Sequence, residues 1–266
     1  MKMPVIAIFV IILGCCIFTS CNDFARADNQ KKHIIEPLLS PPVIDVCIDS
    51  VQECCENLPF PFLFSQTEQS IIGAGCVDIK VIDSSIVVDL KYSTSDNFLG
   101  FDVYGDFNTC YLQIEVAEKL RMAQLFLKSQ FPFYNLIVYD GARPRSVQYK
   151  MWNTLDIPYQ ERSKYLSNPA GGSLHNFGAA VDLSIINENG YELDMGTKYD
   201  YFGELAYPRE EDRMIKEGKL THKQLLNREL LRSVMEQAGF SGITTEWWHF
   251  NSCCRKAAYT KYPIIE

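Results

Sequence analysis

The sequence predicts a single α+β domain over residues 76–266, with a central antiparallel sheet flanked by helices. Short β-rich runs predict strands at 77–82, 86–90, 136–139 and 179–185. Two longer segments with the apolar period of a helix predict helices at 109–130 and 221–238. The run at 179–185 is so apolar that we expect it to be buried on both faces.

The first helix is expected to begin at Asn108 or Thr109, because these residue types cap helix N-termini. The second helix has a capping box, Thr221 with Gln224, and is expected to end at Gly239. Each helix carries an apolar stripe that we interpret as core. The stripes are Leu112, Val116, Leu120 and Leu127 in the first helix, and Leu225, Leu226, Leu230, Val234 and Met235 in the second.

The strand at 136–139 ends at Asp140 and Gly141, a turn signal that places Arg143 at the end of the strand. A guanidinium suits an oxyanion because it keeps its charge and offers several donors in a fixed fork. Taken alone, however, such an arginine favours a surface salt bridge. We expect a helix at 145–155 and then a loop at 156–172 that leads to Ser173.

The stretches GGSLHNFGAAVDLSI and TTEWWHF contain the residue types of a catalytic zinc site. Such a zinc ion takes three protein ligands and keeps its fourth position open for water or substrate. His175, Asp182 and His249 supply a suitable set of ligands. Glu246 is a spare carboxylate that suits a general base.

The spacing of these residues requires bends in the backbone. His175 and Asp182 are seven residues apart, and Glu246 and His249 are three apart, so neither pair shares one face of a straight strand. We expect the first bend at Gly178 and a bulge or turn before the second histidine.

Trp247 and Trp248 are adjacent, so on a strand they would point to opposite sides, one into the core and one towards a pocket. Two further histidines are not expected to be ligands. His222 lies in the exposed first turn of its helix, and His33 lies in the N-terminal segment.

Several stretches together resemble a known family. The first group is Ser173, His175, Gly178, Ala180 and Asp182, and the second is Glu246, Trp247, Trp248 and His249. This pattern resembles the zinc signature of the D-alanyl-D-alanine dipeptidases, the VanX-like branch of the LAS metallopeptidases. DLKYSTSDNFLG, YDGARPRSV, MGTKYDYF and NRELLRSVMEQAGF follow in that family's order, so the resemblance covers roughly residues 77–255.

The resemblance implies the LAS or Hedgehog-like metallopeptidase architecture and one zinc ion per chain. It implies His175, Asp182 and His249 as the ligands and Glu246 as the general base. It also implies that Arg143 stabilises the oxyanion of the tetrahedral intermediate. The positions implied to hold the two ends of a dipeptide are Ser173, Asp200 and Tyr92.

We therefore expect zinc-dependent hydrolysis of D-Ala-D-Ala to two D-alanines. A D,D- or L,D-carboxypeptidase acting on longer peptidoglycan stem peptides is an alternative, and it would also cleave an N-acylated substrate. A non-catalytic binder of wall peptides is disfavoured because the base and all three ligand types are present. The formal net charge of −8, without a basic patch, argues against nucleic acid as a partner.

Residues 1–21 predict a lipoprotein-type export signal. Lys2 precedes a mostly apolar run at 4–18, which is too short to span a bilayer comfortably as a helix. Small residues before Cys21 resemble a lipobox, so Cys21 is expected to carry a lipid anchor. Cleavage before Cys15, or a simple secretory signal, are the alternatives. The prediction is an exported bacterial lipoprotein, periplasmic or held at a membrane through its lipid alone.

Residues 22–75 are rich in proline and are expected to form a tether and an irregular lead-in. Of the ten cysteines, seven remain after the signal and Cys21. An exported chain can form disulfides, yet an odd number leaves at least one thiol unpaired in a monomer. A disulfide at Cys253 and Cys254 is one hypothesis. The other five of these seven cysteines are Cys47, Cys54, Cys55, Cys76 and Cys110.

Overall fold

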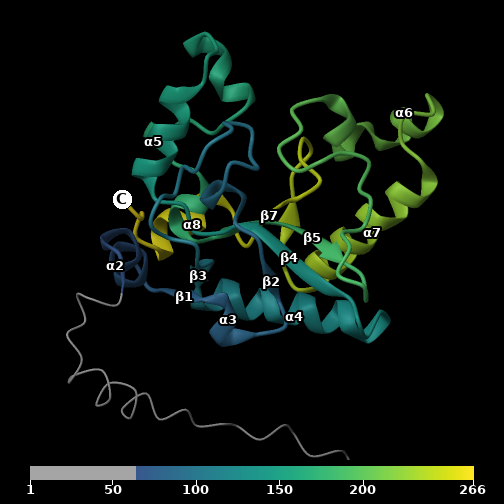
Figure 1. Cartoon of the computed structure of the whole chain (residues 1–266), viewed down its shortest axis with the longest axis horizontal. Coiled ribbons are helices and arrows are strands. Elements are labelled where there is room, and N and C mark those ends of the chain that lie inside the picture. The colour runs from purple at the N-terminus through teal and green to yellow at the C-terminus, as the bar shows by residue number, and fades with distance from the viewer. Residues whose placement is uncertain (1–63) are drawn as a thin grey trace, which may run out of the picture. The chain divides into compact units, whose positions relative to one another are not determined.

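A five-stranded sheet lies at the centre of the fold, in the order β2-β4-β5-β7-β6. The computed structural model describes residues 64–266 (Figure 1). All neighbouring strands are antiparallel except β2 and β4, which are parallel at one edge. The predicted α+β class is confirmed, and the predicted antiparallel sheet has this one parallel pair. The strands are β2 (Val87–Val88), β4 (Asn135–Asp140), β5 (Ala180–Ile186), β7 (His249–Asn251) and β6 (Ser241–Gly242).

The middle strand, β5, is buried along its whole length, as its apolar sequence predicts. It pairs with β4 on one side and β7 on the other. In this register Asp182 lies opposite Asp140 of β4 and opposite His249 of β7. Directly opposed residues of neighbouring strands project to the same face of a sheet. The sheet therefore brings three polar side chains from distant parts of the sequence into one row.

The strand predicted at 77–82 is wrong in its second half. β1 (Cys76–Asp78) pairs with β3 (Tyr111–Gln113) in a separate two-stranded sheet, and α3 (Ile79–Ile82) follows at once. The carboxylate of Asp78 caps this turn by accepting from the backbone N–H of Lys80 at 2.8 Å. A capping residue inside a β-rich run thus converts it to a helix.

The first long helix, α4 (Ile114–Gln130), begins later than predicted. Neither Asn108 nor Thr109 caps it, because the chain first forms β3. Leu112 is consequently buried on that strand and not on the helix. The other members of the stripe, Val116, Leu120 and Leu127, are buried on α4 as expected.

The second long helix, α7 (His222–Gln237), has the predicted capping box, and Gly239 follows it with φ of +85°. Leu226 is 59% exposed, so its predicted place in the core is wrong, whereas Val234 and Met235 are buried. Figure 1 shows α4 and α7 together on one side of the sheet, with α5 (Arg145–Thr154) on the other. Two shorter helices are α6 (Glu211–Lys216) and α8 (Arg255–Lys261).

Part of the segment predicted to be irregular is helical, because α2 (Gln66–Gly73) lies within it. A capping box of Ser65 and Glu68 starts this helix, and Ile71 is fully buried. Several predictions concern residues outside the described part of the chain. These are the export signal, the anchor at Cys21, His33, and most of the tether with Cys47, Cys54 and Cys55. Among residues 64–266, none of the helices combines the length and the apolar character that spanning a bilayer needs.

The four cysteines of the described part, Cys76, Cys110, Cys253 and Cys254, are free thiols. The hypothesis of a disulfide at Cys253 and Cys254 is therefore not borne out by this structure. They instead follow β7 at the start of α8, where the N-cap of the helix is Cys254.

Candidate active site

The row across the sheet supplies two of the predicted ligand side chains. Asp182 of β5 is 3% exposed, and its Oδ1 lies 2.9 Å from Nδ1 of His249 on β7. The predicted bend before His249 is confirmed, because β7 begins at this residue and the chain from Thr244 to Trp248 is irregular. The strand pairing therefore fixes the relative position of these two groups.

His175 reaches the same place from a 3₁₀ turn, Leu174–Phe177. The turn ends at Gly178, whose φ of +61° is the left-handed conformation that glycine adopts without strain. This confirms the bend that the spacing predicts. Nδ1 of His175 donates to the carbonyl of Gly141 at 2.8 Å, which leaves Nε2 facing Asp182 and His249.

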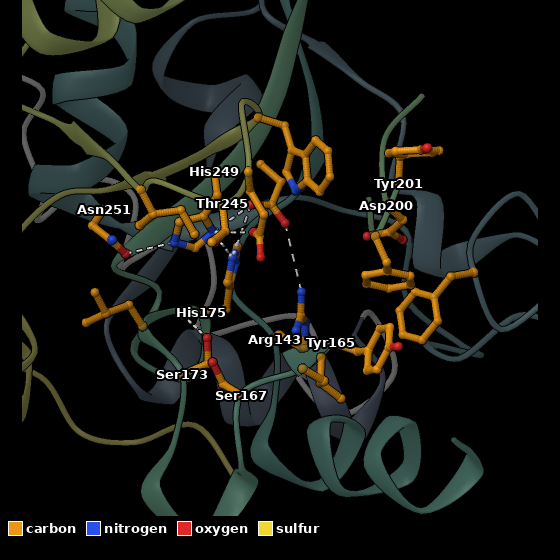
Figure 2. Close-up of a pocket in the computed structure, with 18 of the residues that line it drawn as sticks. Arg143, Tyr165, Ser167, Ser173, His175, Asp200, Tyr201, Thr245, His249 and Asn251 are labelled. Atoms are coloured by element: carbon orange, nitrogen blue, oxygen red, sulfur yellow. Dashed lines mark hydrogen bonds and ion pairs between the residues drawn. The ribbon is translucent and has the colours of Figure 1, made fainter. Parts of the chain in front are cut away.

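The three candidate ligand atoms lie at separations that fit a bound metal ion. Nε2 of His175 lies 3.2 Å from Nδ1 of His249 and 3.4 Å from Oδ1 of Asp182. Tetrahedral bonds of about 2.1 Å put neighbouring ligand atoms about 3.4 Å apart. Figure 2 shows both histidine rings converging on one point. A His-Asp-His group at these separations fits a small divalent cation.

The atoms of these residues that face away from this point have partners of their own. Nε2 of His249 lies 2.9 Å from the side-chain oxygen of Asn251, and the hydroxyl of Tyr199 donates to Oδ2 of Asp182 at 2.9 Å. Such outer contacts orient metal ligands and fix the tautomers of histidines. All three candidate ligands are therefore held in place before any ion arrives.

Charge in the site is balanced between Asp182 and the two histidines. Burial opposes ionisation of Asp182, but His175 and His249 outweigh it and hold the pKa of this carboxyl below its ordinary value. Burial likewise opposes the imidazolium of His249, yet the hydrogen bond that Asp182 accepts from it raises the pKa of His249 to about 9. The ionised carboxylate of Asp182 thus favours a positive charge at this point, whether it is carried by a proton or by a metal ion.

Glu246 lies on the irregular segment just before β7. Its Oε2 is 3.9 Å from Nδ1 of His249, and its side chain is 36% exposed. Partial burial, together with the charge of Asp182, raises the pKa of Glu246 above its ordinary value. The carboxylate therefore faces both the candidate metal position and the open space of the cavity.

Both neighbouring tryptophans are buried, and they divide as predicted. Trp248 lines the cavity. Trp247 turns away, and its indole N–H donates to the hydroxyl of Thr197 at 2.7 Å.

Arg143 is 4% exposed, so a surface salt bridge does not describe it. Its Nε donates to Asp140 at 2.9 Å and its Nη1 donates to Gln148 at 2.8 Å. Its Nη2, which also contacts Asp140, lies 4.0 Å from Oδ2 of Asp182. The guanidinium is thus fixed on one side and presents its remaining edge to the site, beside Asp182 (Figure 2).

The side chains predicted to hold the ends of a substrate lie in the same cavity. Asp200 has φ of +59°, and both its oxygens lie 3.1 Å from the hydroxyl of Tyr92. Burial raises the pKa of Asp200 well above its ordinary value, and the nearby charge of Asp182 adds to this shift. In Figure 2, Ser173 and Asp200 lie on opposite sides of Arg143.

One cavity of about 590 Å³ unites the whole set of predicted site residues. Its wall includes all eight: Tyr92, Arg143, Ser173, His175, Asp182, Asp200, Glu246 and His249. His222, which the sequence does not predict as a ligand, lies at the exposed start of α7 and outside this cavity.

Sequence reasoning missed the residues that hold the site residues in place, namely Asp140, Gln148, Tyr199 and Asn251. Asn251 had a usable signal, because it lies two residues after His249 and so shares its face of the strand. The turn signal at Asp140 and Gly141 does not indicate that Asp140, three residues before Arg143, binds that arginine. For Gln148 and Tyr199 the sequence gives no indication of where the side chain points.

Comparison with known proteins places this chain in a family. The sequence model of the M15 peptidases, described as D-Ala-D-Ala dipeptidase, matches residues 73–263. A D-alanyl-D-alanine dipeptidase of Escherichia coli K12 is 31% identical over 189 residues, which are 71% of this chain and 88% of that protein. One of Enterococcus faecium is 32% identical over 177 residues, 61% of this chain and 83% of that protein.

A solved structure of the LdcB LD-carboxypeptidase aligns with a TM-score of 0.36 and 20% identity, covering 56% of this chain and 63% of that chain. By these sequence comparisons the protein is an enzyme of the hydrolase class, and more narrowly a peptidase. Within that class, the chain belongs to the D-Ala-D-Ala dipeptidase family of M15 peptidases.

Proposed function

We propose that this enzyme is a zinc-dependent dipeptidase that hydrolyses D-Ala-D-Ala to two molecules of D-alanine. The observation that carries the proposal is the meeting of three ligand atoms at separations of 2.9 to 3.4 Å beside a spare carboxylate and a buried arginine. The similarity to dipeptidases named for this substrate supports the choice of peptide.

His175, Asp182 and His249 would hold the metal through Nε2, Oδ1 and Nδ1. Two neutral imidazoles and one carboxylate are a donor set that suits Zn²⁺ and leaves a position open. When bound, a zinc ion supplies Lewis-acid chemistry, which polarises a peptide carbonyl and makes water more acidic.

Glu246 is proposed to move the protons of the reaction. Its raised pKa suits a group that takes a proton from the attacking water and later gives it to the leaving amine. Arg143 is proposed to stabilise the negative charge that develops on the carbonyl oxygen. Its contacts to Asp140 and Gln148 fix the guanidinium in advance, so little reorganisation is needed during the reaction.

Asp200 and Tyr92 are proposed to bind the free ammonium of the dipeptide. The carboxylate of Asp200 has no cation within ion-pair distance among the described residues, so an ammonium would supply the missing charge. An aromatic cluster lies at this end, where the ring of Phe202 is 5.0 Å from that of Phe98 and 5.1 Å from that of Tyr165. Ser173 is proposed to contact the substrate carboxylate at the other end.

A D,D- or L,D-carboxypeptidase remains the second candidate from the sequence. A carboxypeptidase would need space in the cavity for the rest of the peptide, which is attached to the nitrogen of the penultimate residue. The half-buried carboxylate of Asp200 and the rings beside it favour a free amino terminus and hence the dipeptidase.

The experiment is to incubate the purified, zinc-loaded chain with D-Ala-D-Ala and with N-acetyl-D-Ala-D-Ala and to measure free D-alanine. The proposal predicts release from the free dipeptide alone. Equal release from the acetylated substrate would make the enzyme a carboxypeptidase, and release from neither would contradict both proposals.

We further propose that the enzyme is an exported lipoprotein anchored through Cys21, with a role in the turnover or scavenging of cell-wall peptides. The apolar run and the small residues before Cys21 support this proposal. Expression with labelled fatty acid should label the wild-type chain and not a Cys21→Ser variant. A chain that stays unlabelled in a lipoprotein-processing bacterium would contradict the anchor.

A further inference from the structure

Arg255 lines the wall of the active-site cavity, yet no role in the proposed function is assigned to it. Among the residues that line this cavity, the only cations besides the histidines are Arg143 and Arg255. Arg143 already has a carboxylate partner, because it is salt-bridged to Asp140, and it faces the candidate metal ligands. Arg255 has no carboxylate within ion-pair distance among the described residues, although it is a permanently charged group.

The exposed side chain of Arg255 reaches the loop that leads to Ser173. Its Nη2 donates to the carbonyl of Gly172 at 2.6 Å, and its Nη1 is 3.6 Å from the position that a Cβ on Gly171 would occupy. Ser173 is the next residue along the chain and also lines the cavity. One donor of the fork is thus used to place the group, and the others are left for a ligand.

The cavity therefore has opposite charges at separate places. In Figure 2 Asp200, whose carboxylate has no cation partner among the described residues, lies on one side of Arg143, and Ser173 lies on the other. The guanidinium of Arg255 donates to the carbonyl of Gly172, the residue before Ser173. A dipeptide zwitterion has an ammonium at one end and a carboxylate at the other. A carboxylate binds an arginine fork through charge-assisted hydrogen bonds, which are about twice as strong as neutral ones.

We propose that Arg255 binds the C-terminal carboxylate of the substrate together with Ser173 and so selects peptides with a free carboxyl terminus. This inference rests on the proposed function. It assigns the carboxylate end to a residue outside the motifs that predict the zinc site, and it makes Arg255 a determinant of specificity that takes no part in proton transfer.

A purely structural role is the competing explanation, because Arg255 ties α8 to the loop before Ser173. The chain offers a matched control for it. Tyr259, also on α8, donates its hydroxyl to the carbonyl of the adjacent Gly171 but does not line the cavity. Tyr259→Phe removes a tie to the same loop without removing a charge from the cavity. Lys256→Gln, at an exposed position on the same helix, controls for the loss of charge alone.

The test is to measure kcat and KM for D-Ala-D-Ala with the wild-type enzyme, Arg255→Gln, Arg255→Lys and the two controls. The inhibition constant of D-alanyl-D-alaninamide, which lacks the carboxylate, is measured with each. We expect Arg255→Gln to raise KM for the dipeptide by about 10- to 100-fold with kcat little changed, and to leave the inhibition constant of the amide within about threefold. Arg255→Lys should restore part of the loss, and the controls should resemble wild type.

Equal weakening of dipeptide and amide by Arg255→Gln, or the same change in Tyr259→Phe, would overturn the inference in favour of a structural tie. Wild-type KM values in Arg255→Gln would overturn it as well. Failure of the wild-type enzyme to hydrolyse the dipeptide is a different result, because it would refute the proposed function on which the inference rests.

Discussion

The side-chain oxygen of Asn251 lies 2.9 Å from Nε2 of His249, two residues earlier on the same strand. An amide oxygen only accepts hydrogen bonds, so this contact keeps the proton of a neutral His249 on Nε2. Nδ1 is then left with its lone pair towards Asp182 and His175. Asn251, which is not itself a candidate ligand, thus determines that Nδ1 of His249 faces the candidate metal position.

Asn251→Ala should weaken zinc binding by about 10- to 100-fold, because His249 loses the contact that orients its ring. The measurement is competition with a chelator of known zinc affinity. Asn189→Ala, at an exposed turn, serves as the control. Unchanged zinc affinity in Asn251→Ala would show that strand pairing alone orients His249.

Asp200→Asn should raise KM for D-Ala-D-Ala by at least about tenfold without unfolding the protein, because the charge that meets the ammonium is lost. Asparagine is among the few residues that tolerate the left-handed φ of +59° found here. Steady-state kinetics and thermal unfolding of the same preparation check both parts. A normal KM would exclude Asp200 from substrate binding.

The same variant has an expected pH dependence of stability. Burial raises the pKa of Asp200, Asp182 and Glu246 add to the shift, and Tyr92 and Arg143 oppose it. A raised folded-state pKa means that the wild type loses stability as pH rises from the unfolded value of about 3.9 through the folded one. Asp200→Asn should therefore gain stability relative to the wild type as pH rises, measured by urea unfolding at several pH values. A difference that is independent of pH would contradict this account.

Gly178→Ala should destabilise the fold by roughly 2 to 5 kcal/mol, because two costs combine. An added Cβ would lie 2.7 Å from Sγ of Cys76, and alanine is strained at φ of +61°. Gly105→Ala isolates the second cost, since its φ is +74° and nothing lies within 4 Å of the added Cβ. Chemical denaturation of both variants gives the difference, and equal losses would mean that Cys76 moves aside at no cost.

The buried and the exposed thiols of the described region should differ in reactivity. Burial raises the pKa of Cys76 to about 12 and that of Cys110 well above its ordinary value, whereas Cys254 is exposed. Because the thiolate is the reactive form, iodoacetamide at pH 8 should modify Cys254 and leave Cys76 and Cys110 unmodified. Peptide mapping by mass spectrometry checks this, with unfolded protein as the control. Rapid modification of Cys110 in the folded protein would contradict the burial.

The features of the fold that the sequence predicts correctly come from local signals. The capping box at Thr221 and the bend at Gly178 are local, because each rests on the conformational preference of one or two residues, and both are present in the structure. The predicted start of α4 is wrong because Tyr111–Gln113 pairs with β1, which is distant in sequence. The prediction that Leu226 lies in the core rests on its apolar character, whereas the buried positions of α7 include Arg228.

In the candidate site too, sequence signals predict some features and side-chain packing determines the others. The spacing of His175, Asp182, Glu246 and His249 indicated which residue types could meet, and the cavity contains all of them. Their supports could not be foreseen, because the contact of Tyr199 with Asp182 and that of Gln148 with Arg143 depend on where side chains point after packing.

The most direct test of the central claim compares zinc content and D-alanine release in the wild type and in Glu246→Gln. The proposal predicts one zinc ion per chain in both proteins. It predicts that kcat on D-Ala-D-Ala falls by about 10²- to 10⁴-fold in the variant, because a proton carrier is lost while the ligands remain. Full activity of zinc-loaded Glu246→Gln, or a wild-type enzyme that hydrolyses the dipeptide after complete removal of metal, would contradict the account.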